Sequence, residues 1–142
     1  MFKPVFMALL VLLCSCKKNQ EQKIDDFADY YSINAHYEKE HSVLKIDISL
    51  KGPLHAYAPK EPTGKPVRLE ITPQNGWEPL GEAKIPEGRK EKLDLGESYV
   101  LDKDFSIEQR LKPGKGPGEA ILHLQVCTNT QCDRPRTHTL SF

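Results

Sequence analysis

Hydrophobic and polar residues alternate in several short runs along this chain. The clearest run covers residues 44–50, where leucine or isoleucine occupies every second position and polar residues stand between them. A period of two is typical of a β-strand with one buried face and one solvated face. Similar short extended runs are predicted at residues 54–57, 67–71, 77–85, 99–111, 119–127 and 137–142. The pattern therefore predicts a protein built mainly from short strands.

Turn-forming residues separate these runs. The strongest loop signal is the proline- and glycine-rich segment 112–118, and residues 73–76 are predicted to form a turn. Segment 86–96 is charged and is predicted to be irregular. We find no long segment with the periodicity of an amphipathic helix. About seven to nine short strands separated by many turns are typical of an all-β antiparallel β-sandwich.

The amino terminus is apolar and differs from the rest of the chain. Lys3 precedes an almost wholly apolar run at residues 5–13, which is too short to cross a bilayer and is typical of a secretory signal. Residues 13–16, Leu-Cys-Ser-Cys, resemble a bacterial lipoprotein box. We therefore expect a signal peptide at residues 1–15 and a lipid on Cys16. An ordinary secretory signal cut nearby is the alternative.

Both alternatives place the remaining chain outside the cytoplasm, where disulfides persist. The lipoprotein reading predicts a protein anchored to a membrane on the periplasmic side of the cell envelope, and Lys17 favours the outer membrane. Residues 16–30 are mostly polar and are predicted to be a flexible tether, although residues 25–30 are compatible with a helical turn. Residues 31–142 are long enough for one domain with one hydrophobic core.

The cysteine count indicates one disulfide. Cys14 leaves with the signal and Cys16 carries the lipid, so Cys127 and Cys132 remain to pair. Four polar residues between them suit a tight hairpin loop, in which opposed Cα atoms lie about 4.5–5.5 Å apart, within the range of a disulfide. A bond that closes so short a loop stabilises by roughly 2 kcal/mol, against nearly 5 kcal/mol for a loop of a hundred residues. A disulfide that contributes so little stability is more typical of a redox-active pair than of a purely structural one.

Two segments carry a family resemblance. The strand ending in Val126-Cys127, the four residues before Cys132 and the nearby Pro135 resemble the amino-terminal domain of the thiol–disulfide transporter DsbD, a family also called disulfide bond corrector. Residues 52–59 resemble the Gly-x-x-His-x-Tyr strand of that family. The likeness covers roughly residues 30–142. It implies an immunoglobulin-like β-sandwich that performs thiol–disulfide exchange.

The resemblance also implies roles for single residues. Cys132 is expected to form the mixed disulfides and Cys127 to resolve them. His55 and Tyr57 lie two residues apart on one strand, so both point to the same face, and the family places such residues beside the cysteine pair.

The family covers its cysteines with a cap loop that has an aromatic tip. The corresponding segment 91–96 has no aromatic residue, so Leu93 or Leu95 is expected to shield the sulfur atoms instead. With no aromatic tip, we expect the pair to be less protected from small thiols.

Charge and composition exclude several functions. The chain has 20 basic and 20 acidic residues, so it has no basic surplus for nucleic acid. The sequence shows no recognisable Ser–His–Asp catalytic triad and no glycine-rich phosphate-binding loop. We predict no cofactor. The chain also has no CxxC motif of its own. We therefore expect electrons to arrive in trans, from a thioredoxin-like protein or a DsbD-type membrane redox protein, and to pass to oxidised envelope proteins.

Two alternatives remain from the sequence. The first is a non-catalytic β-sandwich lipoprotein that binds a partner and keeps a structural hairpin disulfide. The second is a copper-binding module, because Cu(I) favours thiolate ligands and His123 and His138 are close to the cysteines in sequence.

Overall fold

The structure is a computed structural model, and it describes residues 23–93 and 96–142. Within these residues almost all of the regular secondary structure is β. In chain order it forms the short 3₁₀ helix η1 (Phe27–Tyr30) and the strands β1 (Tyr31–Glu38), β2 (Val43–Leu50), β3 (Ala56–Tyr57), β4 (Arg68–Ile71), β5 (Glu78–Pro79), β6 (Arg89–Leu93), β7 (Gly96–Leu101), β8 (Phe105–Lys112), β9 (Glu119–Leu124) and β10 (Arg136–Ser141).

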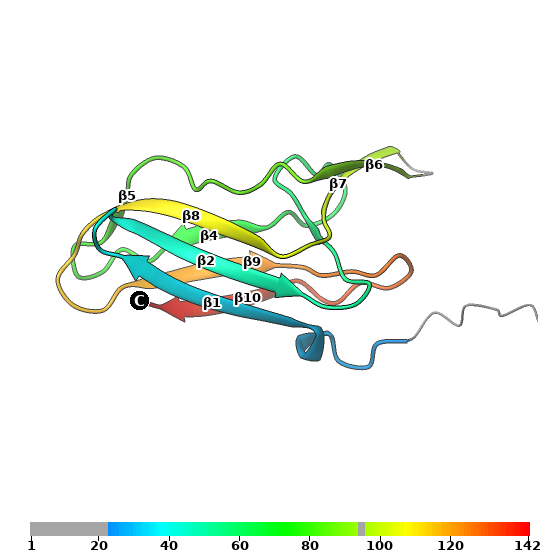
Figure 1. Cartoon of the computed structure of the whole chain (residues 1–142), viewed down its shortest axis with the longest axis horizontal. Helices are drawn as coiled ribbons and strands as arrows, with labels where there is room; N and C mark the ends of the chain where they lie inside the picture. The colour runs from blue at the N-terminus through cyan, green and yellow to red at the C-terminus, as the bar shows by residue number, and fades with distance from the viewer. Residues whose placement is uncertain (1–22, 94–95) are drawn as a thin grey trace, which may run out of the picture.

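Among the strands of the described residues every pairing is antiparallel, and these strands form three small sheets. The first sheet has the order β1-β2-β8-β5, the second β10-β9-β4 and the third β3-β7-β6. The first two sheets pack against each other, and the third extends from one end (Figure 1). The predicted all-β antiparallel sandwich is therefore confirmed.

The core lies between the first two sheets, where the alternation predicts it. On β2, Leu44, Ile46 and Ile48 are almost completely buried, and their polar neighbours are more exposed. On β8 and β9 every second residue is buried as well. Since each buried leucine or isoleucine contributes about 2 kcal/mol of transfer free energy, these strands supply much of the stability that positions the loops at the ends.

Two strands were not predicted. β1 carries the same alternation as its neighbour β2, because Ile33, Ala35 and Tyr37 pack against the core while serine and asparagine face outward. The signal was therefore present in the sequence. β6 falls in segment 86–96, which was wrongly predicted to be irregular. It is a charged strand that forms by pairing with β7 along one edge, so it has no hydrophobic pattern.

The segment before β1 packs on the domain and is not part of a tether. Ile24 and Phe27 are 2% and 4% exposed and belong to the core. The side chain of Asp26 accepts a hydrogen bond from the amide of Ala28 and caps η1. The tether predicted for residues 16–30 is therefore wrong from Ile24 onward, since these two apolar side chains gain more from burial than a free chain gains in entropy.

Both ends of the sandwich have distinct features. At one end in Figure 1 lie the amino-terminal segment, the loop that contains the cysteines and the β6–β7 hairpin. At the other end lie β5 and the carboxyl terminus. There Phe142 packs on Trp77 with ring centroids 5.1 Å apart, and the Trp77 indole donates to the carbonyl of Gly116. No helix in the described ranges is long and apolar enough to span a membrane.

Candidate functional site

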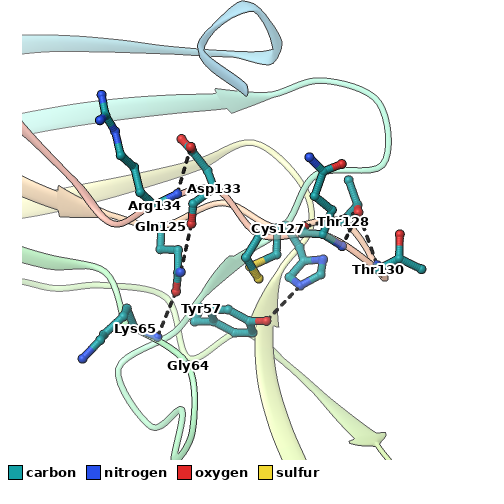
Figure 2. Close-up of a disulfide and its surroundings, with 12 residues drawn as sticks. Tyr57, Gly64, Lys65, Gln125, Cys127, Thr128, Thr130, Asp133 and Arg134 are labelled. Atoms are coloured by element: carbon teal, nitrogen blue, oxygen red, sulfur yellow. Dashed lines mark hydrogen bonds between the residues drawn. A yellow bond between two sulfur atoms is a disulfide. The ribbon is translucent and has the colours of Figure 1, made fainter. Parts of the chain in front are cut away.

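Cys127 and Cys132 form a disulfide within the connection between β9 and β10, which lies at one end of the sandwich (Figure 1). The chain leaves the β9 ladder after Leu124, where the Gln125 side chain donates to the carbonyl of Asp133 and accepts a weak hydrogen bond from the amide of Lys65 (Figure 2). The predicted strand 119–127 therefore ends early, because this side chain replaces part of the backbone ladder. Cys127 then forms an isolated bridge with Cys132.

The Cα atoms of the two cysteines are 4.0 Å apart, closer than predicted. The amide of Asp133 donates to the carbonyl of Val126, and the amide of Thr128 donates to the carbonyl of Gln131. These bonds flank the cysteine pair, so Cys127 and Cys132 occupy a position without hydrogen bonds between them. Opposed residues come closest at such positions in an antiparallel pair.

The two cysteines differ in their access to solvent. Cys127 is 0% exposed, whereas Cys132 is exposed. The backbone of Cys127 forms two hydrogen bonds of 2.9 Å with His55, one in each direction, so Cys127 lies between His55 and Cys132. An incoming thiolate can therefore approach Cys132 from the edge, and Cys127 is the sulfur that faces the protein.

His55 and Tyr57 lie beside the disulfide. Residues opposed in an antiparallel bridge point to the same face, so the His55 side chain flanks Cys127 on the side away from Cys132. Tyr57 follows on the same face. Its hydroxyl is 3.4 Å from His55 Nε2, and the two rings meet edge to face with centroids 5.3 Å apart. The structure thus brings together four of the residues singled out from the sequence.

A surface cleft of about 320 Å³ opens next to this group. It is lined by His55, Tyr57, Glu91, Ser98, Val100, Thr128 and Asn129. Burial lowers the pKa of His55 and outweighs the nearby carboxylates, so the imidazole is neutral at pH 7. Burial also raises the pKa of Tyr57, with smaller contributions from Glu61 and Glu91. Both side chains are therefore neutral hydrogen-bonding groups at neutral pH.

The loop between the cysteines is held by its own hydrogen bonds. The buried hydroxyl of Thr128 accepts from the amides of Thr130 and Gln131 (Figure 2). The Gln131 side chain donates to the carbonyl of Ile24, 3.1 Å away, which ties the loop to the amino-terminal segment. Arg136 pairs with Asp133 on the strand that leaves the loop. The hairpin is thus ordered by contacts other than the disulfide.

Reduction of the disulfide is expected to leave the domain folded. Because the bond closes a loop of only six residues, its loss should lower the free energy of unfolding by about 2 kcal/mol. Denaturant unfolding with and without a reductant measures this difference. The variant with both cysteines replaced by alanine serves as the control, because a reductant should not change its stability. Unfolding of the wild type on reduction would contradict the expectation.

Glu61 is a residue near the site that the sequence analysis missed. It is 8% exposed, and it accepts five hydrogen bonds, two from the hydroxyls of Thr63 and Ser98 and three from the backbone amides of Thr63, Gly64 and Tyr99. Burial favours a higher pKa for Glu61, but these hydrogen bonds together lower it to about 2. A glutamate between prolines gives no sequence signal for burial.

Other predicted residues fall outside the described site. Cys16 and Leu95 lie outside the described residues, and Leu93 is described only as the last residue of β6. The leucine shield over the sulfur atoms therefore stays a prediction.

The two histidines proposed for copper do not meet in the structure. His123 pairs with Thr137 across the β9–β10 ladder, whereas His138 pairs with Leu122. Successive residues of a strand point to opposite faces, so the two imidazoles lie on opposite sides of this sheet. His123 contacts Glu70, and His138 contacts Tyr31. A copper site that combines both histidines with the cysteines does not fit this arrangement.

The fold has known counterparts. The chain is similar to the crystal structure of the reduced DsbD amino-terminal domain of Neisseria meningitidis, with a TM-score of 0.60 and 12% identity over 80% of this chain and 85% of that chain. It is also similar to a structure of the complex between the DsbD and PilB amino-terminal domains of the same organism, with a TM-score of 0.60 and 11% identity over 78% and 80% of the two chains. No protein-family model and no curated protein matches. The likeness confirms the predicted immunoglobulin-like β-sandwich.

Proposed function

We propose that this protein performs thiol–disulfide exchange through Cys127 and Cys132, with a thioredoxin-like protein as its partner. The observation that carries the proposal is the asymmetry of the disulfide. One sulfur belongs to an exposed residue at the edge of a hairpin, and the other to a fully buried residue. Exchange requires an accessible sulfur and a nearby resolving thiol, and this pair supplies both.

The reaction balances as two successive displacements. A thiolate of the reduced partner attacks the sulfur of Cys132, the bond between Cys132 and Cys127 breaks, and Cys127 leaves as a thiolate that takes up a proton. The second thiol of the partner, as a thiolate, then attacks the partner's own sulfur in the mixed disulfide and releases the Cys132 thiolate, which is protonated in turn. Two electrons and two protons pass to this protein, and the partner is left with a disulfide.

His55 and Tyr57 are proposed to act on the leaving sulfur. Their side chains flank Cys127 on the side opposite Cys132 and contact each other at 3.4 Å. Their bulk limits water around the Cys127 sulfur, so the departing thiolate is poorly solvated and the disulfide is protected from rapid reduction. The reduced pair then passes its electrons to an oxidised protein by the reverse sequence of steps, which begins with attack by the Cys132 thiolate.

The proposed setting is the periplasmic side of the cell envelope, with a lipid on Cys16 as the anchor. Its support is the signal-like sequence at residues 1–15 and the lipoprotein-like residues 13–16. The solved complex of the DsbD and PilB amino-terminal domains supports a partner protein that docks on this fold. Because this chain has no CxxC motif, we propose that its electrons come from a separate redox protein.

The reduction potential of the pair tests the proposal against the alternative of a permanent structural disulfide. Exchange-active pairs have potentials above about −300 mV, and structural disulfides of secreted proteins have lower ones. The protein is equilibrated with mixtures of oxidised and reduced dithiothreitol, and its free thiols are counted. A potential above this limit, together with reduction of the folded protein by thioredoxin, supports exchange. A lower potential with no reaction would leave only the binding-module alternative.

A further inference from the structure

Glu61 is a buried carboxylate that forms no ion pair with any described residue. It is more than nine-tenths buried, and all of its interactions are hydrogen bonds. Burying a carboxylate without a cation is costly unless several donors compensate for the lost water. The Glu61 carboxylate therefore serves as the common hydrogen-bond acceptor for several donors.

The two oxygens of Glu61 join two separate parts of the chain. Oε2 accepts from the Ser98 hydroxyl at 2.5 Å and from the Tyr99 amide at 2.8 Å, both on β7. Oε1 accepts from the amide and hydroxyl of Thr63 and from the amide of Gly64, at 2.9–3.2 Å. A carboxylate can accept all five bonds, whereas a glutamine has only one acceptor oxygen. The side chain thus fixes the turn at residues 63–64 to β7.

The turn at residues 63–64 supports the ring of Tyr57. A Cβ atom added to Gly64 would lie 2.7 Å from Cδ2 and 2.8 Å from Cε2 of Tyr57, so the glycine backbone lies directly against the ring. The Tyr57 ring in turn meets His55, and the backbone of His55 is paired with Cys127. A continuous series of contacts therefore runs from Glu61 through Gly64, Tyr57 and His55 to the buried cysteine.

We propose that Glu61 is a positioning residue for disulfide exchange, which holds Tyr57 against His55 beside Cys127 by fixing the turn at Gly64. This inference rests on the proposed function, and it adds a residue whose hydrogen bonds all go to residues outside the cysteine pair. Loss of this clamp, the set of Glu61 hydrogen bonds that joins the turn at Gly64 to β7, lets Tyr57 move away from His55. Water then reaches the Cys127 side of the disulfide, the Cys127 thiolate is better solvated, and it becomes a better leaving group.

Two substitutions test separate links in this series. Glu61→Gln keeps the size of the side chain but removes one acceptor oxygen. Gly64→Ala leaves Glu61 intact and pushes the new methyl group into the Tyr57 ring. Gln109→Ala is the matched control, because Gln109 is also a buried polar residue that donates two hydrogen bonds to the backbone, but it lies on β8. All proteins are compared at a temperature well below the unfolding transition of the least stable variant.

The first readout is the titration of His55 followed by NMR. Around His55 lie Glu61, Glu91, Asp102 and Arg89 as charged groups, and Tyr57. Removing the negative charge of Glu61 would by itself lower the pKa of His55 slightly. A rise of this pKa in both variants therefore requires that Tyr57 has moved and that water has reached the imidazole. A purely structural clamp would leave this pKa in place or lower it.

The second readout is the rate at which dithiothreitol and reduced thioredoxin reduce the disulfide. We expect both rates to rise about fivefold in Glu61→Gln and in Gly64→Ala, with Gln109→Ala unchanged. The inference is overturned if a folded Gly64→Ala variant shows the same His55 pKa and the same reduction rates as the wild type. This outcome decides the matter whether or not Glu61→Gln folds. A wild type that thioredoxin fails to reduce refutes the proposed function instead, and the His55 titration still tests the position of Tyr57.

Discussion

Cys132 in a Cys127→Ala variant is expected to react with thiol reagents about a hundredfold faster than Cys127 in a Cys132→Ala variant. The reason is the difference in burial, since Cys127 is 0% exposed and Cys132 is exposed. The measurement is the rate of labelling of each folded variant by Ellman's reagent. The Cys127→Ala protein, once labelled, should then form a mixed disulfide with a reduced thioredoxin that lacks its resolving cysteine, and the release of the coloured thiolate reports the rate.

The control for this experiment is labelling in denaturant, where both variants should react at similar rates. Equal rates in the native proteins would show that the buried cysteine opens freely, and the assigned roles of the two cysteines would then be wrong. The same Cys127→Ala variant, expressed in the native envelope, identifies the partner, because Cys132 should attack the disulfide of an oxidised partner and stay attached to it. Cys132→Ala should yield no such adduct.

Acid is expected to destabilise the wild type more than a Glu61→Gln variant, by about 3 kcal/mol between roughly pH 5 and pH 2. In the folded protein the pKa of Glu61 is lowered from 4.5 to about 2. Below the ordinary pKa the unfolded chain binds a proton that the folded chain does not bind, so folding loses stability as the pH falls toward 2. Above about pH 5 the contribution is complete and does not change.

Urea unfolding at several pH values measures this contribution. Other carboxylates with lowered pKa values, such as Asp102 beside Arg89, are present in both proteins and cancel in the difference. The difference in free energy of unfolding between the wild type and the variant should therefore shrink as the pH falls. If the free energies of unfolding of the wild type and the variant changed by the same amount at every pH, Glu61 would not be held as a buried carboxylate.

Periodicity predicts the central strands well because burial shapes their sequences. Burial alternates with a period of two along residues 44–49 and 119–124, and both segments lie in the middle of a sheet with one face on the core. β6 escapes this reasoning because it is stabilised by backbone pairing with β7 along an edge, where side chains face water. The packed segment around Ile24 also escapes it, since two apolar residues among charges give no period.

The candidate site is partly readable in the sequence. The cysteine spacing predicts the hairpin, and the His-x-Tyr spacing predicts that His55 and Tyr57 share a face. No spacing argument places that strand beside Cys127, because the pairing joins residues 72 positions apart and depends on the whole fold. Glu61 is harder still. Its burial follows from five donors that only the folded chain brings together, and an isolated glutamate in a loop normally lies in water.

The hydrogen bond from Gln131 to the carbonyl of Ile24 has a practical consequence for laboratory use of this domain. It places the first described residues beside the loop between the two cysteines, while the chain ends at Phe142 at the opposite end of the sandwich (Figure 1). A resin, electrode or fusion protein joined just before Ile24 will crowd the reactive face. The same cargo attached after Phe142 leaves that face pointing outward, so immobilised assays should be coupled through the carboxyl end.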